Sequence, residues 1–279
     1  MEFRTIVDIP KPDFQIEPRE EMLFVGSCFA DNIGKRFSDN LFLTTVNPFG
    51  VMYNPASVLH TLERMYADGA SAFAVPDVAI LSLGTNHVYI LNETGEIVDN
   101  CEKRPQRLFT EKTLSMEECT NYLTRCVNLL QQANPDVRII FTVSPIRYAK
   151  YGFHESQLSK ATLLMAINTL LSSFNCQLST VNCQLLYFPS YEIVLDELRD
   201  YRFYASDMLH PSEQTVDYIY ERFAETFFSE KTLRFVEEYR PIKQALNHRP
   251  FNPDSEEYRR FIAQTKEKLE AFKARYQRS

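Results

Sequence analysis

The chain has 279 residues, of which 44% are hydrophobic and 24% charged, and its formal net charge is −7. This composition fits a globular protein with one large α/β domain and extensions, or with two small domains. The acidic balance argues against nucleic acid or an anionic membrane as the partner. No window reaches the roughly 18 apolar residues of a membrane span. The opening sequence MEFRTIVDIPKPDF lacks the apolar core of a signal peptide, so we expect a cytoplasmic protein.

Five short apolar runs, rich in β-branched and aromatic residues, predict buried parallel strands. In chain order they are 22–25, 41–46, 79–83, 138–143 and 184–188. Helical patterns between these runs lie at 29–40, 55–68, 116–133 and 158–173. Ser115 followed by Glu118 predicts a capped start for the third of these helices. The alternation of strands and helices predicts a doubly wound α/β fold around one five-stranded parallel sheet.

Two segments depart from this alternation. The stretch 87–100 alternates apolar and polar residues around the turn sequence at 92–95. This pattern predicts a β-hairpin inserted after the third strand, where it could wall a pocket at the carboxyl edge of the sheet. After His210 the pattern is helical to the end of the chain, at 212–228, 230–246 and 254–277.

We therefore divide the chain into an α/β domain at 1–228 and a C-terminal helical extension at 229–279, packed on the same domain. The helix expected at 254–277 carries an apolar stripe at helical spacing. Two interpretations of the stripe stay open: packing against the core of the same chain, or a homodimer contact.

The six cysteines form no recognisable metal or redox motif. None is spaced as CxxC, and the pairs Cys119/Cys126 and Cys176/Cys183 are too widely spaced for a zinc knuckle. In a cytoplasmic protein we expect reduced thiols, several of them buried. The sequence therefore predicts no metal site, and we expect no cofactor.

Candidate catalytic residues lie in two short segments far apart in the sequence. Ser27 and Cys28 follow Gly26 directly after the first predicted strand, at the start of a predicted helix. That position favours attack on a carbonyl and stabilises the charge that develops there. Late in the chain, Asp207 and His210 are three residues apart at the start of a helix. The carboxylate can then hold the imidazole in the tautomer that accepts a proton from a nucleophile.

Long motifs across the chain resemble the GSCFA family, which is itself similar to the SGNH (GDSL-type) hydrolase superfamily. The motifs are VGSCFADNIGKRF, NPFGVMYNPAS, SLGT before the hairpin, VSPIRY, HESQLSKATL and YFPSYEIVLDELRDYRFYASDMLHPSEQ. They span roughly residues 20–225. The resemblance implies a three-layer α/β/α sandwich of the flavodoxin-like type, with esterase or acyltransferase chemistry.

The superfamily's sequence blocks map in order onto Gly26-Ser27-Cys28, Gly50, Gly84-Thr85-Asn86, and Asp207 with His210. Aligned without a gap at Gly26, the superfamily's nucleophilic serine falls on Cys28, and the aspartate before it falls on Ser27. Our preferred assignment makes Cys28 the nucleophile. In a second assignment the turn is one residue shorter and Ser27 attacks. In a third, neither attacks, Ser27 caps the helix and Cys28 is a small buried side chain.

The resemblance implies an oxyanion hole formed by the Cys28 N–H, the Gly50 N–H and the Asn86 side-chain amide. Asn86 departs from the family pattern, so the alternative that it only begins the hairpin stays open. We expect the substrate to contact Gly84, Thr85, Arg147 and His154. An exposed Arg147 and a loop-stabilising His154 are the alternatives for the last two.

Together these features predict an esterase, acyl hydrolase or acyltransferase that forms an acyl-enzyme with a small acyl ester. The resemblance implies a short acyl group, which an acylated carbohydrate could carry. The alternative is a non-catalytic carbohydrate- or lipid-binding module on a degenerate fold of the same type. We expect no nucleic-acid or membrane partner, and a homodimer through 254–277 is the one protein contact that the sequence suggests.

Overall fold

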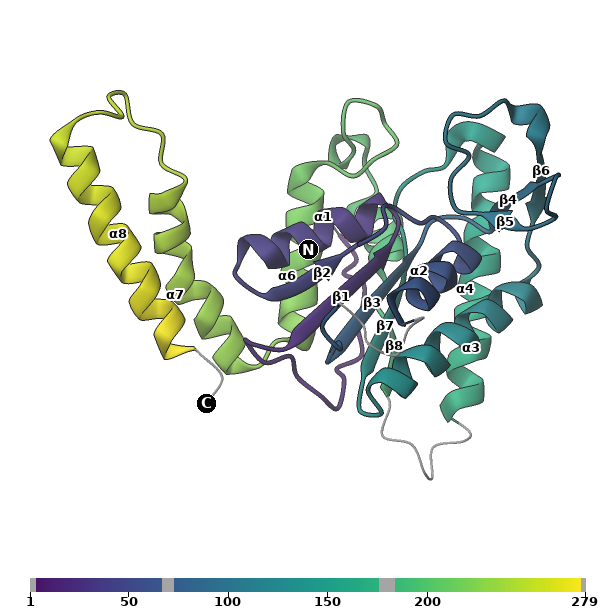
Figure 1. Cartoon of the computed structure of the whole chain (residues 1–279), viewed down its shortest axis with the longest axis horizontal. Coiled ribbons are helices and arrows are strands. Elements are labelled where there is room, and N and C mark those ends of the chain that lie inside the picture. The colour runs from purple at the N-terminus through teal and green to yellow at the C-terminus, as the bar shows by residue number, and fades with distance from the viewer. Residues whose placement is uncertain (1–3, 67–72, 176–183, 277–279) are drawn as a thin grey trace.

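In the computed structural model, which describes residues 4–66, 73–175 and 184–276, a parallel sheet lies between two layers of helices (Figure 1). Its strands in spatial order are β2 (Leu43–Val46), β1 (Glu21–Gly26), β3 (Val78–Leu83), β7 (Arg138–Val143) and β8 (Gln184–Tyr187). All neighbouring pairs are parallel. This is the flavodoxin-like order 2-1-3-4-5 of a doubly wound sheet. The predicted fold class, with its five-stranded parallel sheet, is confirmed.

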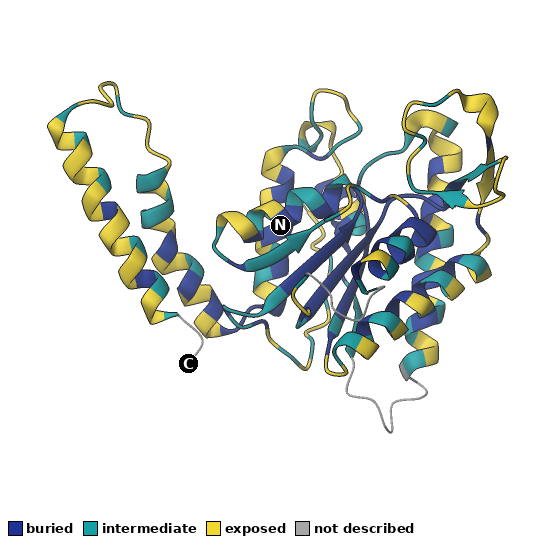
Figure 2. Ribbon diagram, viewed as in Figure 1, coloured by how far each residue is buried: buried dark blue, intermediate teal, exposed yellow. Residues whose placement is uncertain are grey.

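Helices cover both faces of the sheet, and each face has its own apolar core. On one face lie α2 (Pro55–Tyr66), α3 (Met116–Ala133) and α4 (Phe153–Asn175), and on the other lie α1 (Cys28–Asp39) and α6 (Glu213–Phe227). Side chains along β1 and β3 alternate between the two cores. The central strands are therefore buried from both sides (Figure 2), which explains why they are unbroken apolar runs in the sequence.

Most predicted elements end within two residues of the observed ones. Ser115 and Glu118 form the expected capping box at the start of α3. The clearest difference is α4, which begins at Phe153 instead of 158, so that His154 lies in its first turn. The last two positions of the helix expected at 55–68 lie outside the described residues.

The predicted hairpin exists, but it belongs to a larger unit. Its strands are β4 (His87–Leu91) and β5 (Ile97–Val98), and β6 (Phe109–Thr113) pairs with the other edge of β4. No strand pattern marks β6 in the sequence, because only Phe109 of its five residues is buried. This small antiparallel sheet lies beside α2 and the segment that leads into α4 (Figure 1).

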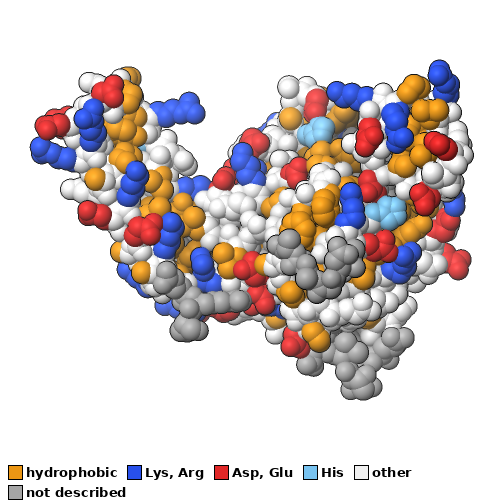
Figure 3. All heavy atoms as spheres, viewed as in Figure 1, with side chains coloured by type: hydrophobic (Ala, Val, Ile, Leu, Met, Phe, Trp, Pro, Cys, Tyr) orange, Lys and Arg blue, Asp and Glu red, His pale blue; other side chains and the backbone are white. Residues whose placement is uncertain are grey.

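The last two helices, α7 (Glu230–Leu246) and α8 (Glu256–Arg275), form an arm that projects from the body (Figure 1). The root of the arm is apolar: the Phe235 ring lies 5.6 Å from that of Phe42 and 5.0 Å from that of Phe272. Of the stripe on α8, only Thr265 and Phe272 are buried. Hydrophobic side chains farther out stay on the surface (Figure 3). The extension thus packs on the domain at its root, and farther along α7 Lys243 Nζ donates to Asn40 Oδ1 at 3.1 Å.

Cys28, Cys101, Cys119 and Cys126 are free thiols, and the last two are buried. Cys176 and Cys183 lie outside the described residues. No helix in the described ranges is long and apolar enough to cross a bilayer. Within the same ranges, no group of three or more His, Cys, Asp or Glu side chains is placed to hold a metal ion.

Candidate active site

The turn from β1 into α1 places Ser27 and Cys28 at the carboxyl edge of the sheet. Gly26 has φ of +142°, and a Cβ at this position would lie 2.0 Å from the Ser82 carbonyl oxygen, so only glycine fits. The Gly26 N–H donates to Asn47 Oδ1 at 2.8 Å, and the Ser27 N–H donates to the Ser82 carbonyl at 3.0 Å. The turn thus lies between β1 and β3, at the switch point where doubly wound sheets bind ligands.

The two candidate nucleophiles have different surroundings. Ser27 is the N-cap of α1 and is 1% exposed; its hydroxyl accepts the Phe29 N–H at 3.2 Å and bonds Ser82 Oγ at 3.0 Å. Cys28 is the first residue of the helix and is partly exposed, with Sγ 3.3 Å from the Tyr53 hydroxyl. Ser27 therefore has the capping geometry of the third assignment, whereas Cys28 offers its side chain to a ligand.

The Asp207–His210 pair has the geometry of an oriented base. Asp207 Oδ2 lies 2.6 Å from His210 Nδ1, and Oδ1 accepts the backbone N–H groups of Leu209 at 2.9 Å and His210 at 3.0 Å. The pKa of Asp207 is lowered to about 2. The largest cause is the hydrogen bond from the His210 N–H, followed by the one from the Leu209 N–H and then the contact with the imidazole. The ionised carboxylate holds Nδ1 and leaves Nε2 directed elsewhere.

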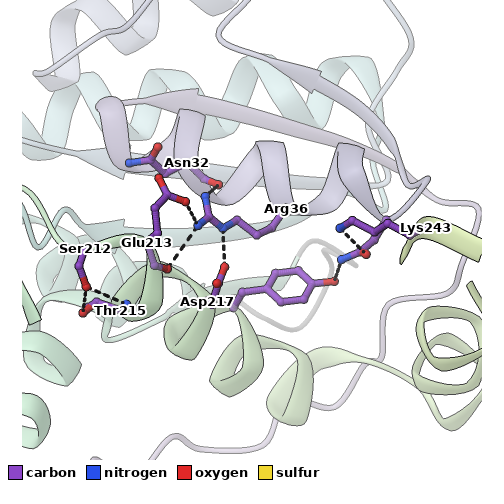
Figure 4. A network of polar contacts seen from close by, with 9 residues as sticks. Asn32, Arg36, Ser212, Glu213, Thr215, Asp217 and Lys243 are labelled. Carbon is purple, nitrogen blue, oxygen red and sulfur yellow. Dashed lines mark hydrogen bonds and ion pairs between the residues drawn. The ribbon is translucent and has the colours of Figure 1, made fainter. Parts of the chain in front are cut away.

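The helices that begin next to these two segments lie side by side (Figure 4). Arg36 of α1 donates to the Glu213 carboxylate of α6 at 2.5 Å and to Asp217 Oδ1 at 2.9 Å. One turn farther along, Asn40 Nδ2 donates to the Tyr220 hydroxyl at 3.0 Å. Residue numbers rise together along both helices, so α1 and α6 run parallel.

The pairing of α1 with α6 shows how the segments that carry Cys28 and His210 lie relative to each other. The contacts join Arg36, about two turns into α1, to Glu213, the first residue of α6, so Cys28 lies beyond the N-terminal end of α6. The Leu209 carbonyl accepts the Arg147 N–H at 3.0 Å, which places the His210 loop next to the loop that follows β7. Among the described residues there is no hydrogen bond between the His210 ring and either Cys28 or Ser27. The fold thus brings base and thiol to the same edge of the sheet without joining them in this state.

Two expected oxyanion donors make hydrogen bonds within the protein. The N–H of the exposed Gly50 donates to the Asn47 carbonyl at 2.8 Å. The Asn86 amide is buried and donates to the Leu114 carbonyl at 2.7 Å, and the Asn86 N–H donates to Ser159 Oγ at 3.0 Å. Asn86 therefore holds the start of the small sheet. Local sequence does not reveal Asn47 and Leu114 as the partners of these groups.

Three of the residues expected to bind substrate have other surroundings. The N–H groups of Gly84 and Thr85 donate to the Tyr53 carbonyl at 2.8 and 2.9 Å, and Thr85 Oγ1 bonds Ser159 Oγ at 3.0 Å. Both residues are buried, and Gly84 lies against Tyr53 and Ser27. His154 is exposed on the first turn of α4. The structure thus does not bring His154, Gly84 and Thr85 together as a ligand-contacting set.

Arg147 does line a cavity, of about 440 Å³. Its guanidinium carbon lies 4.1 Å from the Phe153 ring centroid, and Tyr201 and Tyr204 lie within 5.6 Å. Arg147 Nη1 donates to the Met208 carbonyl at 2.9 Å, which ties this cavity to the loop that carries Asp207 and His210. Cys28 and His210 are not among the residues that line the cavity.

A buried lysine that was not predicted as part of the site lies between the loops that follow β3 and β7. Lys160 of α4 is 2% exposed, and its Nζ donates to the carbonyls of Gly84 at 2.7 Å and Ser144 at 2.8 Å. Burial lowers the pKa of Lys160 to about 7. The ammonium group joins the loops that follow β3 and β7. The one sequence signal was its place inside the HESQLSKATL motif, because a lysine on a helix is usually exposed.

Comparison with known proteins identifies similar sequences and folds. A model described as the GSCFA family matches residues 21–73 and 67–223, and one described as the GSCFA domain protein, C-terminal domain, matches 240–278. No curated protein matches the sequence.

Several solved structures are similar at low identity. A carbohydrate esterase family 3 protein from Talaromyces cellulolyticus is 11% identical, with a TM-score of 0.42 over 78% of this chain and 99% of that chain. A family two carbohydrate esterase from Clostridium thermocellum is 12% identical, with a TM-score of 0.43 over 78% and 65% of the two chains. An acetyl xylan esterase from Butyrivibrio proteoclasticus is 14% identical, with a TM-score of 0.40 over 78% and 64%. Similarity at this level carries no argument about the reaction.

Proposed function

The chain belongs to the GSCFA family, and on that premise we propose that it is an ester hydrolase or acyltransferase whose nucleophile is Cys28. The observation that carries the proposal is the Asp207–His210 contact of 2.6 Å, in the loop before α6, the helix that runs parallel to the one beginning at Cys28. A thiol at a helix N-terminus lies at the positive end of the helix dipole, which stabilises negative charge that develops beside it. An imidazole whose Nδ1 is held by a carboxylate can accept the thiol proton at Nε2.

In the proposed reaction, His210 Nε2 takes the Cys28 proton and Sγ forms a bond to the ester carbonyl carbon. Asp207 stabilises the imidazolium. When the intermediate collapses, the bond to the leaving oxygen breaks, and the imidazolium gives its proton to that oxygen. His210 then activates water for hydrolysis, or an acceptor hydroxyl for transfer. Catalytic hydrogen bonds that are long in a free enzyme tighten with bound substrate, so we expect sulfur and imidazole to approach in the complex.

The proposed substrate class is an acylated carbohydrate, with its sugar in the cavity at Arg147. The aromatic side chains of Tyr201 and Tyr204 line this cavity, and Tyr201 is exposed. The charged lining is balanced between two carboxylates and two guanidinium groups: Asp196, Asp200, Arg147 and Arg199. Such a lining offers acceptors and donors for hydroxyl groups while its formal charges cancel, which suits a neutral polar ligand better than an anion.

The proposal is tested by hydrolysis of p-nitrophenyl acetate and of an acetylated methyl glycoside. We expect Cys28→Ala and His210→Ala each to lower kcat by about 10²–10⁴-fold or more, since a nucleophile and its base act as a unit. Ser27→Ala should keep its turnover within about tenfold, because Ser27 caps the helix at a cost of about 1 kcal/mol in stability. The glycoside should show the lower KM.

Other outcomes would contradict parts of this proposal. Full activity of Cys28→Ala with loss in Ser27→Ala would make Ser27 the nucleophile. Full activity of both would exclude covalent catalysis at this turn. Binding of the glycoside with no turnover by the wild type would favour the carbohydrate-binding module.

Three further expectations also remain proposals. They are a cytoplasmic location, the lack of nucleic-acid and membrane partners, and a homodimer through α8. The exposed outer half of the α8 stripe, with Phe261 on the surface, supports the last of them. The reaction steps above use no cofactor.

A further inference from the structure

One polar group touches the proposed nucleophile and has no part in the mechanism so far. The Tyr53 hydroxyl lies 3.3 Å from Cys28 Sγ. Tyr53 belongs to the segment between β2 and α2, and it is 39% exposed. Both side chains are thus open to a ligand on the same side of the turn.

The backbone around Tyr53 is fixed on two sides. Its carbonyl accepts the N–H groups of Gly84 and Thr85, and the preceding Met52 N–H donates to the Gly26 carbonyl at 2.8 Å. The ring packs on Gly84, where an added Cβ would lie 3.4 Å from Tyr53 Cδ1. The phenol is therefore held in place by the ends of β1 and β3, the two strands that flank the turn.

Two of the three expected oxyanion donors make hydrogen bonds within the protein, and the Tyr53 hydroxyl can take the place of one of them. The Gly50 N–H and the Asn86 amide donate to protein carbonyls. The Cys28 N–H is the first of α1 and has no acceptor among the described residues. One backbone donor thus remains beside the sulfur, whereas tetrahedral intermediates of acyl transfer are usually held by two or more.

We propose that the Tyr53 hydroxyl is a catalytic residue that donates, with the Cys28 N–H, to the oxyanion formed during acyl transfer. The inference rests on the proposed function. When Sγ bonds to the carbonyl carbon, the π electrons move to the carbonyl oxygen, which then lies two bonds from sulfur. A hydroxyl 3.3 Å from the sulfur can reach that oxygen at the roughly 2.7–3.1 Å that an oxyanion donor requires.

The phenol must keep its proton to act in this way. Burial, and then the contact with Cys28, raise the pKa of Tyr53 above its ordinary value. At neutral pH the hydroxyl therefore keeps its proton and can donate. It gives a hydrogen bond and transfers no proton, so the proton balance between Cys28, His210 and the leaving oxygen is unchanged.

The test is Tyr53→Phe, which keeps the ring against Gly84 and removes only the hydroxyl. Its kcat on p-nitrophenyl acetate should fall by about 10–10³-fold with little change in KM, since the donor acts on the transition state. The matched control is Tyr66→Phe, which removes a buried hydroxyl that has no hydrogen-bond partner among the described residues and should leave kcat unchanged.

A second measurement separates this role from damage to the turn. Alkylation of Cys28 by iodoacetamide, followed by peptide mapping, should proceed at nearly the wild-type rate in Tyr53→Phe, with Cys101 as the internal reference. An unchanged kcat overturns the inference, as does a kcat that falls by the same factor as Cys28 alkylation. If Cys28→Ala is inactive while Tyr53→Phe is fully active, only the inference fails. If Cys28→Ala is fully active, the proposed function itself fails.

Discussion

The turn that carries Cys28 and the loop that carries His210 lie at the same edge of the sheet, but they are held in opposite ways. The turn is buried, and the backbone at Gly26 and Ser27 is bonded to residues of other segments. In the loop, the Asp207 and His210 side chains are 45% and 43% exposed and bond each other. The whole fold thus places the proposed nucleophile, whereas a single local carboxylate orients the proposed base.

This difference has a consequence for mutations. Changes at the buried backbone of Gly26 should disturb folding before they reveal anything about the reaction. Changes in the loop should leave the fold intact and report on the reaction directly.

The largest effect is expected for Gly26→Ala. The new Cβ would meet the Ser82 carbonyl at 2.0 Å, in a backbone conformation that L residues rarely adopt. We expect a loss of about 4 kcal/mol or more in the free energy of unfolding, or no folded protein. The control is Gly95→Ala, at φ of +72° with no atom within 4 Å, which should cost only about 1–2 kcal/mol. Equal losses in urea unfolding would contradict the account of the turn.

A smaller effect, dependent on pH, is expected for Lys160→Met. The pKa of Lys160 is lowered to about 7 in the folded protein from 10.5, so between these values the unfolded chain binds more protons. The stability of the wild type should therefore rise with pH in this range. The free energy of unfolding of the wild type relative to Lys160→Met should be about 2 kcal/mol greater at pH 9 than at pH 7. A difference independent of pH would show that the buried ammonium does not titrate as described.

The smallest effect on stability is expected for a change in the loop that carries His210. His210→Ala changes a partly exposed side chain, so its free energy of unfolding should stay within about 0.5 kcal/mol of the wild type. A loss as large as that of Gly26→Ala would show that the loop, too, is part of the structural framework.

The sequence was sufficient to predict the strands whose two faces are both buried. The residues of β7, such as Ile139, Ile140 and Phe141, are fully buried, and the predicted strand at 138–143 coincides with the observed one. β6 has a single buried residue, Phe109, and therefore carries no apolar run or alternation.

For the site, the sequence was sufficient where partners are close in the chain. The Asp207–His210 contact joins residues three apart, so spacing alone predicted it. The choice between Ser27 and Cys28 depends on where the helix starts, and the positions of Asn86, Tyr53 and Lys160 depend on partners tens of residues away. Such nonlocal hydrogen bonds leave no periodic pattern.

The most direct test of the central claim is the site of the covalent intermediate. Wild-type protein mixed with p-nitrophenyl acetate and quenched in acid should gain the mass of one acetyl group, and peptide mapping should locate it on Cys28. Cys28→Ala should gain none under the same conditions, while Ser27→Ala should still be acetylated. An adduct on Ser27, or turnover without any adduct on this turn, would contradict the claim.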